Sequence, residues 1–302
     1  FVEVKVSLMP VTKQSATNHF KRCKPLLGTY VEVSVLSEKN NNDILIDISE
    51  CVFSEIQRIE NLMSFHDPDS ELSYINREAY NHSCSISKDM EEVLLAALNL
   101  SKVTNGIYDI SIAPTLVRNG ILPDQSIDVD DQANWQDISI IKGKISFKRK
   151  LLIDLGGIAK GYAVDRALCM VENQVKNITV NAGGDLRIKE WSGESVGIKA
   201  SDTKGFNSLI FVPMHQAALA TSSNYYIDVN KSAIIDPFTK KELKDKKSIS
   251  VFASNCMLAD ALTKVAFLDI TLIPIFKPLG VKAISIDESG NVQDLCERLE
   301  HG

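Results

Sequence analysis

A chain of 302 residues with 44% hydrophobic residues is long enough to bury a large core. Its formal net charge is −6, and Lys and Arg are scattered along the sequence, which argues against nucleic acid as a partner. No apolar run approaches the roughly 20 residues that span a bilayer, so the chain as given is not expected to be integral to a membrane.

The six cysteines lie far apart and form no C-x-x-C pair. This spacing predicts separate thiols rather than a zinc site. An even number of cysteines also permits disulfides if the protein is exported. The chain begins at Phe1, which allows for an upstream signal or anchor segment.

In the first third of the chain, hydrophobic periodicity predicts strands and two helices. The predicted elements are an N-terminal arm or added edge strand over 1–20, a strand over 26–35, and helices over 44–63 and 89–103. The second helix is expected to end at Asn105-Gly106, and a turn is expected over 67–70.

The rest of the chain mixes strands and helices without a regular βαβ rhythm. The predicted elements are a hairpin of 138–141 and 144–147, a buried strand over 151–155, a helix over 158–172, short strands between 178 and 221, a helix over 256–267 and a β pair near 281–286. This pattern favours an α+β fold, with residues 21–302 forming a single domain.

The strongest local signal is the segment 153–165, which reads Ile-Asp-Leu-Gly-Gly-Ile-Ala-Lys-Gly-Tyr-Ala-Val-Asp. Its paired glycines allow the backbone to approach a phosphate, and the amides that open the following helix, together with Lys160, supply positive potential. The segment lacks the G-x-G-x-x-G and Walker patterns, and strand-to-helix glycines are more often plain turns. Taken alone, it is a weak indication of phosphate binding.

Two further segments place polar groups at strand ends. Residues 180–186 read Val-Asn-Ala-Gly-Gly-Asp-Leu, for which a hairpin turn is the simpler interpretation. Residues 220–223 read Ala-Thr-Ser-Ser, and their hydroxyls are suited either to binding phosphate or to capping a turn.

Together with 63–72, 106–111, 234–237 and 259–262, these segments resemble, in order, the motif series of the ApbE family. The resemblance runs from about residue 27 to 267. It implies an α+β, two-lobed fold with mixed or antiparallel sheets, flanking helices and an FAD cleft between the lobes. It also implies an FAD:protein FMN transferase, which moves FMN from FAD to a Thr or Ser hydroxyl of an acceptor protein and releases AMP. Mg²⁺ is expected to offset the negative charge.

The resemblance carries site residues over to this chain position by position. The implied FAD contacts are Met63, Ser64, Tyr108, Asp109, Gly156, Gly157, Lys160, Gly161, Asp165, Asn181, Gly183, Gly184, Asp185 and Thr221. The implied Mg²⁺ ligands are the Ala159 carbonyl, Asp260 and Thr263, and such hard oxygen ligands suit this ion.

Lys264 departs from the family pattern, which has Thr or Ser four residues after the ligand aspartate. Three interpretations stay open. Thr263 lies within reach at i+3 and substitutes as the ligand. Alternatively, Lys264 neutralises Asp260 and weakens or replaces the metal, since unit charges 4 Å apart gain about 4 kcal/mol at an effective dielectric constant near 20. In the third interpretation, Lys264 extends into solvent.

A second departure lies in the segment 232–240. Ala233, Phe238 and Lys240 stand where the family commonly has His, Arg and Gly. Loss of an imidazole base is expected to slow transfer, because general-base catalysis contributes roughly 100- to 10,000-fold. His66, His215 and Asp236 are alternative candidates, each with a simpler structural interpretation, and no catalytic base is assigned.

Two alternative functions follow from these departures. One is an FAD pyrophosphatase that gives FMN and AMP, and the other is an FAD-binding protein without transferase activity. The expected partners are FAD and an acceptor flavoprotein with an exposed Thr or Ser. The resemblance favours the cell envelope or periplasm, with membrane anchoring through a missing N-terminal segment, whereas the unpatterned cysteines also suit the cytoplasm.

Overall fold

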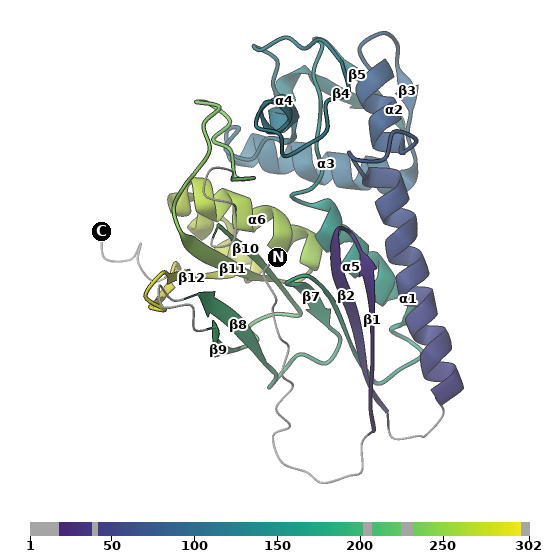
Figure 1. The fold of residues 1–302 in the computed structure, drawn as a ribbon, viewed down its shortest axis with the longest axis vertical. Coiled ribbons are helices and arrows are strands. Elements are labelled where there is room, and N and C mark those ends of the chain that lie inside the picture. Colours follow the sequence, from purple (N-terminus) through teal and green to yellow (C-terminus); the bar gives the residue numbers. More distant parts are fainter. Residues whose placement is uncertain (1–17, 38–41, 202–206, 225–231, 297–302) are drawn as a thin grey trace. The chain divides into compact units, whose positions relative to one another are not determined.

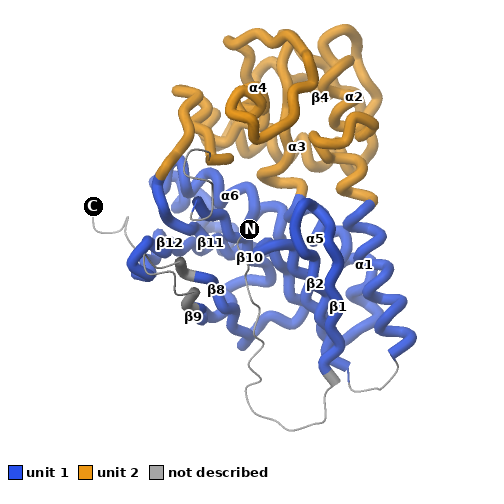
Figure 2. The backbone as a smooth tube through the Cα atoms, in the orientation of Figure 1, with its two compact units in different colours: residues 1–57, 160–226, 245–302 blue, residues 58–159, 227–244 orange. Residues whose placement is uncertain are grey.

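The computed structural model describes residues 18–37, 42–201, 207–224 and 232–296. Two compact units divide the chain (Figure 2). Unit 1 comprises residues 1–57, 160–226 and 245–302, and unit 2 comprises residues 58–159 and 227–244. Each unit draws on separate stretches of the chain, so neither is a simple N- or C-terminal domain. The part of the predicted arm before residue 18 lies outside the described residues.

Unit 1 is built on an antiparallel sheet of eight strands (Figure 1). In spatial order the strands are β1 (Asn18–Leu26), β2 (Thr29–Ser37), β6 (Asn177–Ala182), β7 (Asp185–Ile188), β10 (Ala218–Ser223), β11 (Lys247–Ala253), β12 (Lys282–Asp287) and β13 (Val292–Asp294). Every neighbouring pair in this order is antiparallel. Together with the helices, the sheet confirms the α+β class.

The two faces of this sheet carry different elements. On one face, Leu219 and Phe252 belong to a hydrophobic cluster with Val196 of a two-stranded ribbon. Side chains alternate along a strand, so Ser222 points to the other face, where it contacts α6. The ribbon is formed by β8 (Ser195–Ser201) and β9 (Asn207–Pro213), and α6 spans Cys256–Leu268.

Three predicted helices are present with nearly the expected bounds. They are α1 (Asn42–Met63), α5 (Ala159–Val171) and α6. An ion pair joins α1 to α5, with Glu55 Oε1 3.6 Å from Arg166 Nε. The predicted β pair near 281–286 is the hairpin of β12 and β13, after the 3₁₀ segment η3 (Ile270–Leu279).

Unit 2 contains a three-stranded sheet and three helices. Its elements are α2 (Glu71–Glu78), β3 (Cys84–Ser85), α3 (Lys88–Val103), η1 (Ile110–Ile112), α4 (Ala113–Arg118), η2 (Trp135–Asp137), β4 (Ile138–Ile141) and β5 (Lys144–Phe147). The predicted hairpin and α3 are confirmed. The sequence prediction missed α2, because eight residues show too little periodicity. Its start is marked by Ser70, whose Oγ accepts from Ser73 N at 3.0 Å.

Two predicted strands differ from the structure. The strand predicted over 26–35 is interrupted, because Leu27 and Gly28 form the turn between β1 and β2. Residues 151–155 are largely buried as predicted, but they pair with no strand among the described residues. Instead, Asn76 Oδ1 accepts from Ile153 N at 2.9 Å, and Asn76 Nδ2 donates to Ile153 O at 3.0 Å. A side-chain amide thus takes the place of a neighbouring strand.

Replacing Asn76 by Ala is expected to destabilise the protein by about 2 kcal/mol, because it leaves a buried N–H and a buried C=O of Ile153 unpaired. The free energy of unfolding from urea titration measures the change. Asn99 is exposed on α3 and provides the matched control, so Asn99→Ala should have little effect. Equal stability of the two variants would contradict the role given to Asn76.

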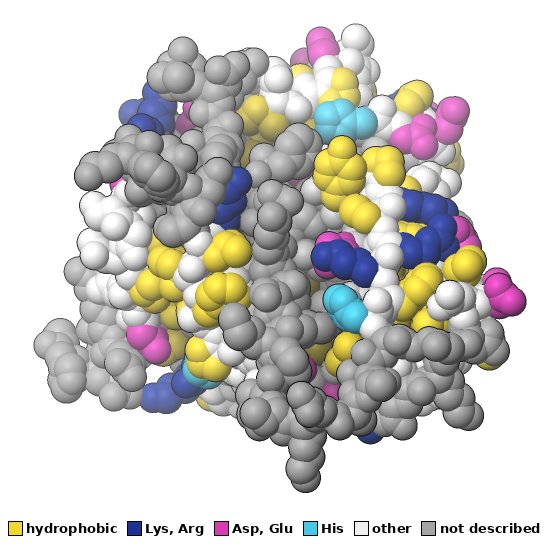
Figure 3. All heavy atoms as spheres, turned by 60° about the horizontal axis from the view of Figure 1, so that its bottom comes forward, with side chains coloured by type: hydrophobic (Ala, Val, Ile, Leu, Met, Phe, Trp, Pro, Cys, Tyr) yellow, Lys and Arg dark blue, Asp and Glu magenta, His cyan; other side chains and the backbone are white. Residues whose placement is uncertain are grey.

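The basic residues of β1 are paired rather than free. Lys21 Nζ lies 2.6 Å from Glu32, and Glu50 lies 2.7 Å from Arg22 and 2.6 Å from Lys24. On the described part of the face drawn in Figure 3, Lys and Arg lie beside acidic and hydrophobic side chains. No continuous basic surface is present on that part of the face.

All six cysteines are free thiols, as the spacing predicted. Within the described residues, no helix combines the length and the apolar character needed to cross a membrane.

Candidate functional site

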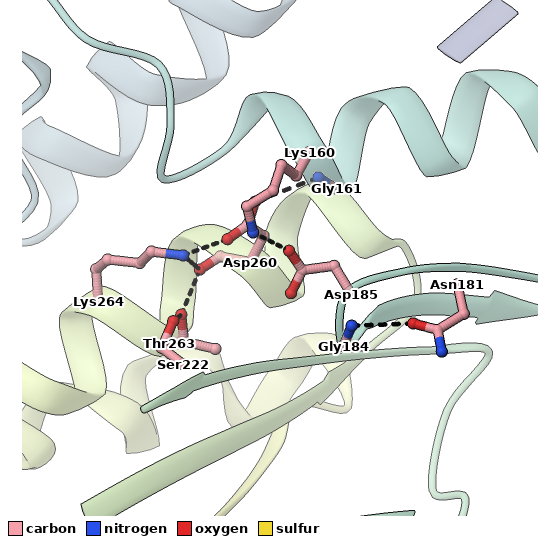
Figure 4. A network of polar contacts seen from close by, with 9 residues as sticks. All are labelled: Lys160, Gly161, Asn181, Gly184, Asp185, Ser222, Asp260, Thr263 and Lys264. Atoms are coloured by element: carbon pink, nitrogen blue, oxygen red, sulfur yellow. Dashed lines mark hydrogen bonds and ion pairs between the residues drawn. The ribbon is translucent and has the colours of Figure 1, made fainter. Parts of the chain in front are cut away.

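Two buried carboxylates and two lysines form a cluster in unit 1 (Figure 4). Lys160 Nζ contacts Asp185 Oδ2, and Lys264 Nζ contacts Asp260 Oδ1. The side chains of Asp185 and Asp260 are 2% and 0% exposed, whereas those of Lys160 and Lys264 are 33% and 23% exposed. The carboxylates are therefore sealed from solvent, whereas both lysine side chains are partly exposed.

Two ion pairs join α5 to β7. Asp185 and Arg187 are two residues apart on β7 and so face the same side of the sheet. Asp185 pairs with Lys160 in the first turn of α5, and Arg187 Nη1 lies 3.0 Å from Asp165 Oδ1 one turn further on. These two ion pairs fix α5 relative to β7 and place Lys160 beside Asp185, the first residue of the strand.

Asp165 also joins α5 to the start of α6. Its carboxylate accepts from Cys256 N at 2.9 Å and from Met257 N at 2.8 Å. Burial raises the pKa of Asp165, although these amides and Arg187 act to lower it. Both oxygens are thus used inside the protein. The structure places Asp165 as a support of the site, and its predicted contact with FAD stays a prediction.

Gly161 allows α5 and α6 to approach closely. A Cβ at this position would lie 2.3 Å from Cys256 O and 2.8 Å from Met257 Cα. The amide of Gly161 donates to Asp260 Oδ2 at 3.2 Å. The glycine therefore both permits the helix contact and fixes the buried carboxylate.

Charges in the cluster shift one another's pKa values. Burial raises the pKa of Asp185, and the charge of Asp260 raises it further against the opposing effect of Lys160. Burial acts in the same direction on Asp260, but Lys160 and Lys264 outweigh it, so its pKa lies below the usual range. Burial would lower the pKa of Lys160, but the two carboxylates raise it above that of a free lysine. At neutral pH, Asp260 is ionised and Lys160 is protonated.

Thr263 and Lys264 make different contacts with Asp260. Thr263 Oγ1 donates to the backbone carbonyl of Asp260 at 2.7 Å and lies 2.7 Å from Ser222 Oγ. Lys264 Nζ contacts the carboxylate and also donates to the carbonyl at 3.1 Å. Of the three interpretations of Lys264, the structure shows the ion pair with Asp260 rather than extension into solvent.

Replacing Ser222 by Ala should destabilise the protein by about 1 kcal/mol, because it removes a partly buried hydrogen bond to Thr263. The neighbouring Ser223 is the matched control, since its buried Oγ has no hydrogen-bond partner among the described residues. Ser223→Ala is therefore expected to be neutral or slightly stabilising. Thermal unfolding of both variants measures the difference, and an equal loss in both would contradict the assignment.

Gly183 and Gly184 form the two-residue turn between β6 and β7. Their φ angles are +64° and +111°, and Asn181 Oδ1 accepts from Gly184 N at 3.0 Å. The hairpin interpretation of this segment is therefore confirmed. Thr221 Oγ1 lies 2.8 Å from Ser250 Oγ, on the sheet face opposite Ser222. Contacts of these residues with FAD stay predictions.

The other predicted FAD contacts belong to unit 2. Met63 and Tyr108 are buried in its interior. Ser64 Oγ accepts from His66 N and Asp67 N, both at 3.2 Å, and shapes the loop after α1. Gly156 is exposed and Gly157 half-buried, ahead of Ala159 at the start of α5.

Asp109 lies at an open pocket of unit 2. Burial raises the pKa of Asp109, although Ser111 donates to its Oδ1 from both N and Oγ at 2.7 Å. The pocket has a volume of about 1540 Å³, and its lining includes Gly106, Trp135 and Lys240. It thus brings the segment 106–111 together with the segment 234–240, where the chain departs from the family pattern.

The candidate bases have structural contacts of their own. Asp236 Oδ1 accepts from Phe238 N at 2.8 Å and from Thr239 N at 3.1 Å, which forms the turn after Pro237. The His215 ring packs edge-on against Phe252 at 5.1 Å. Burial, with the charge of Lys282, lowers the pKa of His215.

Sequence reasoning missed the parts played by Ser222 and Arg187. Strand alternation could have found both, because Arg187 lies two residues after Asp185, and Ser222 must face away from Thr221. Across the described residues, no group of three or more His, Cys, Asp and Glu side chains is arranged to hold a metal ion.

This fold defines an α+β protein whose unit 1 holds a cluster of two lysines and two buried carboxylates. Residues 27–269 match the sequence model of the ApbE family, and the chain belongs to that family.

Relatives and solved structures agree with this assignment. The FAD:protein FMN transferase of Vibrio cholerae is 27% identical over 266 residues, which cover 79% of this chain and 78% of the relative. The FAD:protein FMN transferase of Haemophilus influenzae is 26% identical over 88% of this chain and 85% of the relative. The fold is similar to that of the flavin transferase ApbE from Vibrio cholerae, with a TM-score of 0.76 and 21% identity. The match covers 92% of this chain and 96% of the Vibrio cholerae structure. It is also similar to that of the ApbE protein of Thermotoga maritima, with a TM-score of 0.77 and 24% identity. This match covers 94% of this chain and 98% of the Thermotoga maritima structure.

Proposed function

We propose that this chain is an FAD:protein FMN transferase that moves FMN from FAD to a Thr or Ser hydroxyl of an acceptor protein. The observation that carries the proposal is membership of the ApbE family over residues 27–269, together with relatives named for this reaction. The lysine and carboxylate cluster supports it, because a diphosphate is the part of FAD that two ammonium groups would bind.

In the proposed reaction, the acceptor oxygen forms a bond to the phosphorus of the FMN half. The bond from that phosphorus to the bridging oxygen breaks, and its electron pair leaves with AMP. The proton of the acceptor hydroxyl passes to the departing phosphate oxygen of AMP or to water, so that the atoms balance. Lys160 and Lys264 would bind and orient the diphosphate through their ammonium groups, and such positioning is a main requirement of phosphoryl transfer.

The residues around Asp260 decide whether the predicted Mg²⁺ site can form. Oxygen donors are available, since Asp260 belongs to the cluster, the Thr263 hydroxyl donates to the Asp260 carbonyl, and Ala159 immediately precedes Lys160 in the chain. However, the Lys264 ammonium already lies against the Asp260 carboxylate, where a cation would bind. These residues do not fit a metal ion at Asp260 beside Lys264, so no step proposed here uses one.

Product analysis tests the proposed function against its alternatives. The chain is incubated with FAD, with and without a candidate acceptor that carries an exposed Thr in a flexible segment, and the nucleotides are separated by chromatography. Transfer predicts AMP that increases with acceptor, without an equal amount of free FMN. Equal amounts of AMP and free FMN would indicate a pyrophosphatase, and bound FAD without AMP would indicate a binding protein.

The acceptor is proposed to be a flavoprotein, by analogy with the protein FMN transferases among the relatives. We also propose a location in the cell envelope, where fractionation of cells should recover the chain. Recovery in the cytoplasmic fraction would contradict that location without affecting the proposed reaction.

A further inference from the structure

Lys264 occupies the position at which a metal ligand was expected, and its ammonium group is bonded to the carboxylate that the metal was expected to use. We propose that Lys264 is the resident cation of the diphosphate site, so that this chain cleaves FAD without a divalent metal. The inference rests on the proposed function and specifies which group stands beside Asp260 in place of a metal ion.

Both carboxylate oxygens of Asp260 already have a donor. Lys264 Nζ contacts Oδ1, Gly161 N donates to Oδ2 at 3.2 Å, and the backbone carbonyl accepts from Thr263 and Lys264. The side chain is completely buried. A metal ion at Oδ1 would have to compete with the lysine for this oxygen.

The charges in the cluster are balanced without a metal. Lys160 and Lys264 offset Asp185 and Asp260, so the four side chains carry no net charge when all are ionised. A neutral residue at 264 would leave one uncompensated negative charge in a buried place, which is a strong attraction for a cation. The lysine removes that attraction.

Thr263 does not restore the expected ligand set. Its hydroxyl donates to the Asp260 carbonyl and therefore accepts from Ser222 Oγ–H. These two bonds hold it between the α6 backbone and β10, whereas Lys264 takes the place beside the carboxylate (Figure 4).

The Lys264 side chain stays partly exposed despite this ion pair. About a quarter of its side chain is exposed, and the buried carboxylate fixes its position. A fixed ammonium group can bind a phosphate oxygen without the reorganisation that a free surface lysine needs. Lys160, held in the same way by Asp185, provides the second positive charge.

The test compares AMP release from FAD in EDTA and in Mg²⁺ for the wild-type chain and two variants. The wild-type rate should be the same in both conditions. Lys264→Thr should lower it about 100-fold in EDTA, as loss of one fixed donor does, and Mg²⁺ should restore it. Lys264→Met is the matched control, because it removes the charge without supplying a ligand oxygen, and Mg²⁺ should not restore its activity.

A second measurement does not depend on turnover. Titration calorimetry with MgCl₂ alone should detect no binding to the wild-type chain and binding to Lys264→Thr, whose melting temperature should also rise with Mg²⁺. A wild-type chain that binds Mg²⁺ in this titration, or that needs it to release AMP, would overturn the inference. Absence of AMP under every condition would overturn the proposed function, and the Mg²⁺ titrations would still decide the role of Lys264.

Discussion

Replacing Lys160 by Met is expected to reduce AMP release from FAD by about 100- to 1,000-fold, because it removes one of two fixed positive charges from the diphosphate site. The same change should destabilise the protein by about 3–5 kcal/mol, since it leaves the buried carboxylate of Asp185 without its partner. Urea titration and the rate of AMP release measure the two effects separately.

A double variant separates binding of the substrate from support of the fold. In Lys160→Met/Asp185→Asn the buried charge is gone, so most of the lost stability should return. Activity should stay low, because the ammonium group is still missing. A double variant that recovers both stability and activity would contradict a contact between Lys160 and the diphosphate.

Replacing Gly161 by Val is expected to destabilise the protein by about 3 kcal/mol or more. Overpacking a core typically costs about 1–3 kcal/mol, and this contact lies at the upper end because it is very close. The added side chain would collide with the backbone of Cys256 and Met257, which cannot move aside as a flexible side chain can. The gain in helix propensity over glycine is below about 1 kcal/mol and cannot compensate. AMP release should fall as well, because the amide of Gly161 holds Asp260.

Gly156 is the matched control for this substitution. It lies five residues earlier and has no positive φ, and a Cβ there would meet only the Asp154 side chain, at 3.0 Å. Gly156→Val should therefore change the free energy of unfolding much less. Should the Val variant at 161 fail to fold, Gly161→Ala gives a smaller step in the same direction. Equal losses at 156 and 161 would contradict the packing argument.

Much of the fold could be predicted because its elements are long or strongly patterned. The helices over 44–63 and 256–267 and the hairpin at 138–147 were predicted almost to the residue. The segment 151–155 was misread for a physical reason. Its apolar residues are buried as in a central strand, but its backbone partner is the amide of Asn76, far away in the sequence. Burial alone does not reveal which group pairs with the backbone.

The site could be predicted only in part. Paired glycines and Lys160 indicated a place for phosphate, but the partner of Lys160 lies on β7, which only the folded chain brings to α5. Lys264 and its partner Asp260 lie one turn apart on α6, so that pair could be considered from the sequence. The choice between Thr263 and Lys264 depended on the direction of side chains on one helix. Spacing allows both to reach Asp260, and the structure shows which of them meets its carboxylate.

Covalent flavin on an acceptor protein is the most direct test of the account. The acceptor is incubated with this chain and FAD and then denatured, and its intact mass and flavin fluorescence are recorded beside those of an acceptor whose Thr is changed to Ala. Transfer predicts an added FMN moiety on the Thr-bearing acceptor alone, with one AMP released for each. FAD cleaved to free FMN and AMP, with no flavin retained on the denatured acceptor, would contradict it.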